Sequence, residues 1–163
     1  MADVTQKIDS TILARYVLHK VGQISQLKLQ KLLYYIQAWH LAYFGEPLIE
    51  DEFQAWMHGP VVRRVWEEYK GQSVLFNDIV IDDNSQKEAV AVTKASLSED
   101  QLELIADVLS EYGSKSAYEL EKLTHSESPW VDARRGTGPA EASDTIITKT
   151  SITEYFKKLL IPS

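Results

Sequence analysis

Apolar residues recur at helical spacing close to the start of the chain. The first stripe consists of Ile12, Leu13, Tyr16 and Val17. Asp9 or Ser10 is suited to cap this helix, because both side chains accept hydrogen bonds from free backbone N–H groups. Gly22 is suited to end it, since glycine is favoured just past the last helical turn. The pattern therefore predicts a first helix between these positions.

A longer periodic segment follows and ends at Gly45. Its apolar positions include Leu29, Leu32, Leu33, Ile36 and Tyr43, and Leu27, Tyr34, Tyr35, Leu41 and Phe44 widen the stripe. Ser25 precedes the segment as a candidate cap. A helix that is apolar around most of its circumference must be covered on nearly all sides. We therefore expect this second helix to lie at the centre of the fold.

The stretch FQAWMHGPVVRRVWEEYKG, residues 53–71, contains two predicted elements. Residues 52–56 alternate polar and apolar, which predicts a short strand. Gly59 is then in place for a helix cap and Pro60 for the first helical position, where its missing N–H costs nothing. These residues predict a third helix that ends at Gly71 and buries Trp66 on its apolar face.

In the rest of the chain, the clearest patterns are residues that predict the start of a helix. Residues 73–94 fit either short strands or irregular cover, and residues 82–85 are expected to form a turn or an exposed loop. Capping boxes predict helices that begin at Ser98–Gln101, Ser116–Glu119 and Ser151–Glu154. Ser128 and Pro129 predict a single turn through Trp130, and residues 134–139 predict a loop.

Together these elements predict a mainly α protein: a single compact helical domain of about six helices with a minor extended or β component. We expect residues 1–8 to be a flexible N-terminus and residues 9–163 to be the domain. There is no cysteine for a disulfide or a thiolate site, no secretory signal and no stretch long enough to span a membrane. The expected location is the cytoplasm.

The charge of −7 is unevenly distributed along the sequence. Residues 1–45 contain five Lys/Arg and two Asp, which gives them a net charge of +3. The other 118 residues therefore have a net charge of −10. Binding to nucleic acid needs clustered Lys and Arg at the phosphates, so the acidic part of the chain argues against such a partner. Two explanations of such an acidic surface remain open. It would suit a basic partner, or it serves to keep the protein soluble.

The four histidines do not form a recognisable metal or catalytic motif. No two share a helix face at ligand spacing, and there is no phosphate-binding loop or nucleophile elbow. We therefore predict no metal, no cofactor and no enzymatic activity. His40 is expected to be a hydrogen-bonded core residue.

His58 and His125 each precede a proline-initiated turn and a tryptophan, in HGPVVRRVW and HSESPW. Each ring can fix its loop by hydrogen-bonding a backbone carbonyl. If the fold brings the two together, they would instead form an aromatic recess for a ligand or partner. An enzyme that uses this pair as general acid and base is an alternative, although no nucleophile accompanies them.

Two further patterns leave alternatives open. Arg63 and Arg64 can pair with acids four residues on, but with the base first, which contributes little to helix stability. Either this arrangement arose by chance, or the two arginines have a partner elsewhere, within the domain or on another protein. Residues 10–45 also resemble a helix-turn-helix, which makes a DNA-binding regulator another alternative. Against it, the second helix is too apolar to lie open in a major groove.

The sequence resembles the Panacea domain, the family of SocA-like antitoxins also labelled phage-associated proteins. The residues that carry the likeness are KLQKLLYYIQAWHLAYFGEPLIEDEFQAWMHGPV, a later LTHSESPW and the late pair Tyr155–Phe156. The resemblance extends from about Asp9 to the C-terminus. About eight residues precede the first helix, so we expect no accessory domain ahead of it.

The resemblance implies an antitoxin that neutralises a cognate toxin encoded beside it, through direct protein contact. A SocA-like member also delivers its toxin to an energy-dependent protease, so a protease or its unfoldase is a second implied partner. Tryptophan and arginine are favoured interface anchors. The candidate partner-binding residues are Trp56, His58, Gly59, Pro60, Arg63, Arg64, His125 and Trp130.

Overall fold

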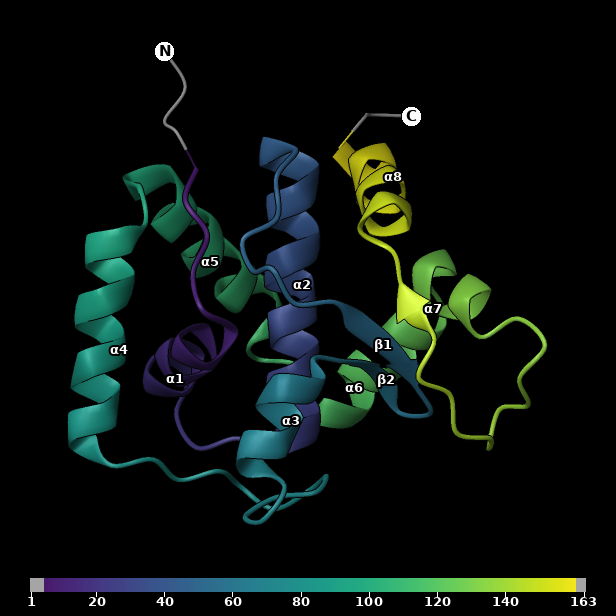
Figure 1. Cartoon of the computed structure of the whole chain (residues 1–163), viewed down its shortest axis with the longest axis horizontal. Helices are drawn as coiled ribbons and strands as arrows, with labels where there is room; N and C mark the ends of the chain where they lie inside the picture. Colours follow the sequence, from purple (N-terminus) through teal and green to yellow (C-terminus); the bar gives the residue numbers. More distant parts are fainter. Residues whose placement is uncertain (1–4, 161–163) are drawn as a thin grey trace.

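The computed structural model describes residues 5–160, which form eight helices and three short strands (Figure 1). The helices are α1 (Ser10–Val21), α2 (Gln26–Phe44), α3 (Arg63–Tyr69), α4 (Asp83–Ser96), α5 (Glu99–Tyr112), α6 (Ala117–His125), α7 (Ser128–Ala133) and α8 (Lys149–Leu160). The strands are β1 (Phe53–Trp56), β2 (Gly59–Val61) and β3 (Ile146–Ile147). The predicted class, mainly α with a small extended part, is confirmed, with two more helices than the six expected.

Helix α2 is the central element, as its apolar pattern predicts. Helices α1, α3, α5, α6 and α8 all pack against it (Figure 1). Ser25 Oγ accepts a hydrogen bond from the Lys28 N–H at its start, and Gly45 ends it with a left-handed φ of 73°. His40 is fully buried, where Nδ1 contacts the Glu46 carbonyl at 2.6 Å and Nε2 contacts Gln101. Its prediction as a core residue is confirmed.

The strands form one small antiparallel sheet in the order β2-β1-β3. Trp56 pairs with Gly59 across the β1–β2 hairpin, and Met57 and His58 form its turn. The prediction that Gly59 and Pro60 start a helix is therefore wrong. The reason is local pairing: Gly59 has a φ of 115°, which suits a tight turn, and Pro60 lies on an edge strand, where no N–H is needed. Helix α3 begins only at Arg63.

Helix α4 replaces the strands or irregular cover considered for residues 73–94. Asp82 Oδ1 accepts a hydrogen bond from the Ser85 N–H, so the predicted loop 82–85 is in fact a helix start. The helix packs on α1 and buries only Ala89 and Thr93. An interface this narrow leaves little apolar periodicity in the sequence, which is why the pattern did not reveal it.

The two middle capping boxes are present as predicted, at Ser98–Gln101 and Ser116–Glu119. The third is not, because α8 begins at Lys149, before the predicted Ser151. Thr148 Oγ1 accepts the hydrogen bond from the Ser151 N–H and replaces Ser151 as the capping residue. The threonine lies three residues before the serine, at the spacing of a true cap.

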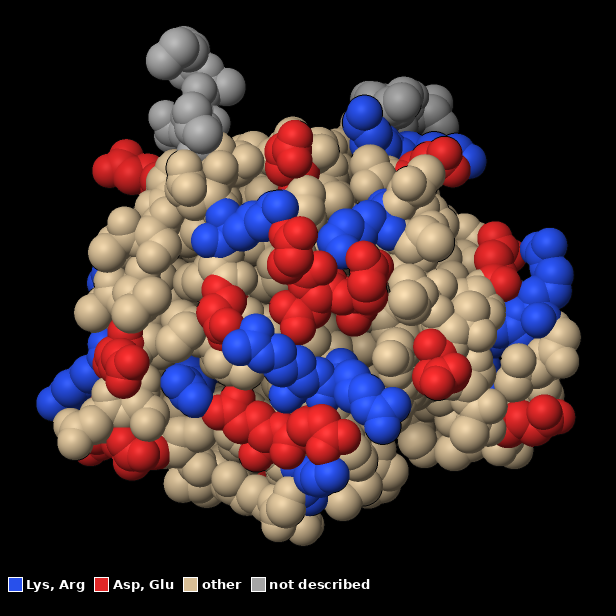
Figure 2. Space-filling model, in the orientation of Figure 1, with Lys and Arg blue, Asp and Glu red and all other residues tan. Residues whose placement is uncertain are grey.

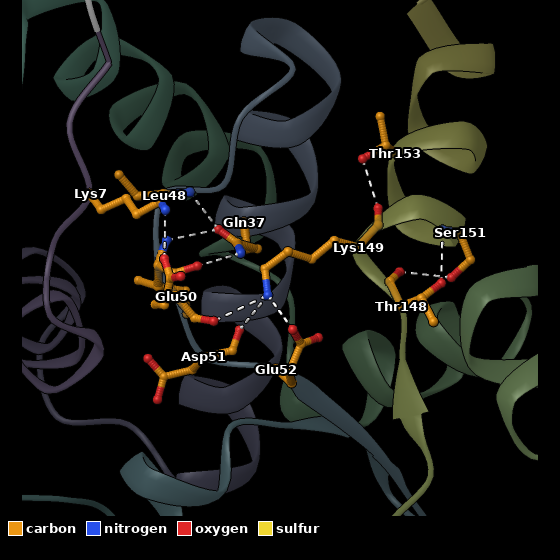
Figure 3. Close-up of polar contacts among 11 residues, drawn as sticks. Lys7, Gln37, Leu48, Glu50, Asp51, Glu52, Thr148, Lys149, Ser151 and Thr153 are labelled. Carbon is orange, nitrogen blue, oxygen red and sulfur yellow. Dashed lines mark hydrogen bonds and ion pairs between the residues drawn. The ribbon is translucent and has the colours of Figure 1, made fainter.

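Two side chains fasten the loop between α2 and β1 (Figure 3). Gln37 Oε1 accepts hydrogen bonds from the N–H groups of Leu48 and Ile49, and its Nε2 donates to the Ile49 carbonyl. Lys149 Nζ reaches from α8 to the same loop, where it donates to two backbone carbonyls and to Glu52 at 2.6 Å. The loop thus joins α8 to the central helix.

The described part of the N-terminal segment is held against the domain. The Ile8 N–H donates to the Leu48 carbonyl, Gln6 exchanges hydrogen bonds with Gln101, and Lys7 pairs with Glu50 at 2.6 Å. Residues 1–4 of the segment expected to be flexible lie outside the described residues. Within residues 5–160, no helix has the length and apolar character needed to cross a membrane.

Candidate functional site

A cavity of about 690 Å³ lies beside the β1–β2 hairpin and is named here the hairpin groove. Its walls are the first two turns of α2, the hairpin, α3 and the segments 74–75 and 140–144. The lining includes Trp56, Met57, His58, Val61, Arg63 and Trp66. Three of the candidate residues, Trp56, His58 and Arg63, therefore meet in one concave site.

Tryptophans shape one side of the hairpin groove. The rings of Trp56 and Trp66 meet edge to face, with centroids 5.1 Å apart, and both side chains are half-buried. Trp56 Nε1 donates to Gln54 Oε1 at 2.8 Å. Met57 lies next to them at the hairpin turn and is 37% exposed. This wall thus presents large apolar surfaces whose ring positions are fixed by packing.

The segment from His125 to Arg134 supports the hairpin from outside the groove. Trp130 Nε1 donates to the Trp56 carbonyl at 2.8 Å, and the His125 ring stacks on Trp130 with centroids 3.9 Å apart. Arg134 donates to the Ala55 carbonyl at 2.9 Å and to the carbonyls of Gly138 and Glu141. Arg134 therefore joins the hairpin to the loop at Gly138 and Glu141. This loop leads into the segment 140–144, which forms another wall of the groove.

Glu121 on α6 links the two histidine positions. His58 Nδ1 lies 2.6 Å from Glu121 Oε1, at a side chain that is 36% exposed. Burial lowers the pKa of His125, and the charge of Glu121 partly opposes this shift. Among the described residues, His125 Nε2 is buried without a hydrogen-bond partner. The histidines are thus in one electrostatic neighbourhood, but only His58 lines the groove.

Lys31 lies beneath the hairpin and is fully buried. Its Nζ donates to the Pro60 carbonyl at 3.2 Å. Burial, opposed by the charge of Glu121, lowers its pKa to about 7. A Cβ on Gly59 would lie 2.4 Å from Lys31 Cε, and the φ of 115° is also unfavourable for any residue with a Cβ. Gly59 and Pro60 are themselves buried, and any contribution they make to partner binding is through the shape of the hairpin.

Two glutamines of α2 hold the groove's other edge. Gln30 accepts a hydrogen bond from the Val62 N–H at 2.9 Å and donates to the Val62 carbonyl, as a neighbouring strand would. Gln26 donates to the carbonyls of Trp66 and Ser73. Sequence reasoning did not predict that Gln26, Gln30 and Lys31 bond the hairpin and α3. The available signal was the presence of four polar residues, Gln26, Lys28, Gln30 and Lys31, within the first turns of an otherwise apolar helix.

The adjacent arginines of α3 point to different surroundings. Arg63 lines the hairpin groove and lies 3.7 Å from Glu67. Arg64 forms an ion pair with Asp9 at 2.8 Å, while Glu68, its expected partner, pairs with Arg15. Arg64 is not among the lining residues, and the same holds for His125 and Trp130.

The two alternative functions require arrangements that the structure does not contain. A DNA-binding surface on residues 10–45 needs Lys20, Lys28 and Lys31 exposed on one face, but Lys31 is fully buried and Lys28 donates to the Gly113 carbonyl. A catalytic histidine pair needs both rings at an open pocket, but His125 is packed under Trp130.

Comparison with known proteins identifies the family. Residues 29–131, more than half of the chain, match the family described as Antitoxin SocA-like, Panacea domain. The chain is also 31% identical over 140 residues to Antitoxin SocA of Caulobacter vibrioides (strain NA1000 / CB15N), an alignment that covers 82% of this chain and 74% of the relative. No solved structure matches the chain. The chain therefore belongs to the SocA-like antitoxin family with a Panacea domain.

Proposed function

We propose that this protein is an antitoxin that neutralises a toxin protein by binding a segment of it in the hairpin groove. The observation that carries the proposal is the convergence of Trp56, His58 and Arg63 on one cavity of about 690 Å³. Family membership supports the toxin as the partner. The groove is large enough to enclose several side chains of a partner, because ligand sites commonly measure a few hundred cubic ångströms.

The composition of the groove favours binding to a protein segment with large apolar side chains. Trp56, Trp66 and Met57 offer aromatic and thioether surfaces, which are common at interface centres. Arg63 stands at the rim with a side chain that is 56% exposed, and it can donate several hydrogen bonds to acceptors on the partner. The segment that enters should therefore combine apolar side chains with a carboxylate or backbone carbonyl near Arg63.

The rigidity of the hairpin supports the same conclusion. Trp130 and Arg134 fix the backbone of β1 by direct hydrogen bonds, and Lys31 fixes β2 from below. A wall that is already ordered loses little conformational entropy when a partner binds. His125, Trp130, Gly59 and Pro60 act in this proposal by positioning the wall, while Trp56, His58 and Arg63 contact the toxin. Arg64 has no contact role in it.

Co-expression with the product of the adjacent gene tests the proposal. The wild-type protein should restore growth and co-purify with the toxin. Met57→Glu places a charge in the groove and should abolish both effects. Val92→Glu on α4 is the matched control, because Val92 has the same exposure of 37% and lies outside the groove. The proposal fails if the neighbour is harmless, if rescue occurs without a complex, or if both variants behave alike.

The same experiment separates masking from delivery to a protease. If the protein only masks the toxin, the toxin accumulates in the rescued cells as a stable complex. If it also delivers the toxin, toxin levels fall in rescued cells and recover when the protease or its unfoldase is deleted. We propose masking as the basic step, because binding in the groove is sufficient for it.

A further inference from the structure

A second hollow, of about 530 Å³, lies between the C-terminal half of α2 and helix α5 and is named here the acidic groove. Trp39, Tyr43, Phe44 and Tyr112 provide its aromatic surface. Asp100, Glu103, Asp107 and Glu111 line it from α5. The acidic groove and the hairpin groove have no lining residue in common.

The aromatic surface of the acidic groove is both exposed and fixed in position. Tyr43 is 60% exposed and lies beside Trp39, with ring centroids 6.0 Å apart. Trp39 Nε1 donates to Tyr112 Oη at 3.0 Å, and Tyr112 stacks on the buried Tyr35 at 4.2 Å. The exposed ring of Tyr43 therefore packs on aromatic rings that are themselves held in place. Such an exposed, ordered aromatic surface is typical of one that a partner covers.

The carboxylates of the acidic groove lie along one face of α5, because their spacings are three, four and four residues. All four residues are exposed, and within residues 5–160 none has a Lys, Arg or His partner within 4.0 Å. By contrast, the face in Figure 2 carries acids and bases close together, and Arg15–Glu68 and Lys149–Glu52 are ion pairs of this kind.

This arrangement is unfavourable for the helix itself. Glu103, Asp107 and Glu111 are like charges four residues apart, and such pairs destabilise a helix. Asp107 and Glu111 also lie in its second half, where the macrodipole favours bases. Neither helix stability nor an intramolecular ion pair accounts for the acidic row. A positively charged partner would account for it.

We propose that the acidic groove binds a basic amphipathic helix of a partner protein. The row from Asp100 to Glu111 extends for roughly 16 Å along α5, which matches about three turns of a partner helix. The apolar face of that helix would cover Tyr43 and Trp39, and its Lys and Arg residues would lie against the carboxylates or over the aromatic rings. The two grooves can be occupied together, so this proposal does not depend on the toxin's place in the hairpin groove.

A designed peptide provides a direct test. The probe is a fluorescein-labelled Leu/Lys peptide of about 14 residues, with its leucines on one helical face. Fluorescence anisotropy should show saturable binding to the purified protein that weakens as salt is raised. Glu103→Lys/Asp107→Lys should weaken binding by about tenfold or more, because attraction becomes repulsion.

The matched control is Glu88→Lys/Glu154→Lys, which changes the net charge equally at two exposed acids on α4 and α8. Its affinity should equal that of the wild type, and a scrambled peptide of the same composition should bind weakly. Urea unfolding confirms that both double variants are folded. The proposal is overturned if the wild type shows no saturable binding, if both double variants weaken it equally, or if the scrambled peptide binds as well. Self-association abolished by Glu103→Lys/Asp107→Lys would assign the groove to a second copy and also overturn it.

Discussion

At the scale of single side chains, two buried ionisable residues, Lys31 and Glu127, make stability depend on pH near neutrality. Lys31 is buried beneath the hairpin, and its pKa is lowered to about 7. Glu127 is 5% exposed, accepts hydrogen bonds from Tyr35 Oη at 3.0 and 3.1 Å, and has its pKa raised to about 7 by burial. Each is an ionisable group in a position where its neutral form is favoured.

These shifts predict opposite pH dependences on the two sides of neutrality. Between pH 4.5 and about 7 the folded state binds the extra proton at Glu127, so the free energy of unfolding falls as pH rises. Between about 7 and 10.5 the unfolded state binds the extra proton at Lys31, so the free energy of unfolding rises with pH. The contribution should be on the order of 3 kcal/mol for Glu127 and on the order of 5 kcal/mol for Lys31.

Urea unfolding over this pH range measures both contributions. Glu127→Gln should flatten the falling part of the curve, and Lys31→Met should flatten the rising part. Comparison of each variant with the wild type removes the contributions of all other groups, because those are common to both proteins. A rise above pH 7 that is unchanged in Lys31→Met would contradict a neutral buried lysine.

At the scale of elements, the sequence predicted helices better than the hairpin. Helices α1, α2, α5 and α6 follow from apolar periodicity and caps that act within a few residues of each other. Gly59 and Pro60 suit a helix start equally well by local rules, but they pair with Trp56 and Ala55 in a hairpin that residues distant in the sequence hold in place. Gln30, which fixes Val62, lies 32 positions away from it. Such contacts leave no local pattern.

The sequence likewise indicated only part of the residues that line the candidate site. Trp56, His58 and Arg63 were selected by residue type and do line one groove, whereas Arg64, selected for the same reason, lies outside it. Adjacent residues on a helix point in directions about 100° apart, so the choice between the two arginines depends on how α3 is rotated. That rotation is set by the packing of Val65 and Tyr69.

The loop between α2 and β1 allows a prediction at the scale of elements. Gln37→Leu keeps the size of the side chain but leaves the N–H groups of Leu48 and Ile49 without their acceptor inside the protein. We expect a loss of about 3 kcal/mol in the free energy of unfolding. Lys149→Met, which removes the partly exposed contact to the same loop, should cost about 1 kcal/mol. Equal losses, measured by urea unfolding, would contradict this ranking.

At the scale of the whole molecule, α2 connects two surfaces of different character. Its first turns form part of the hairpin groove, which contains Lys31 and Arg63, and its last turns form part of the acidic groove. The uneven charge of the sequence indicated an acidic body but not the place where acids remain unpaired. The structure locates unpaired acids on α5 and mixed charges on the face seen in Figure 2.

The most direct test of the account is the affinity of the purified toxin for two single variants, Arg63→Ala and Arg64→Ala, measured by titration calorimetry. Both side chains are 56% exposed on the same short helix, but only Arg63 lines the hairpin groove. We predict that Arg63→Ala weakens binding by about tenfold or more and that Arg64→Ala changes it by less than about twofold. Equal effects, or a larger loss for Arg64→Ala, would contradict binding of the toxin in the hairpin groove.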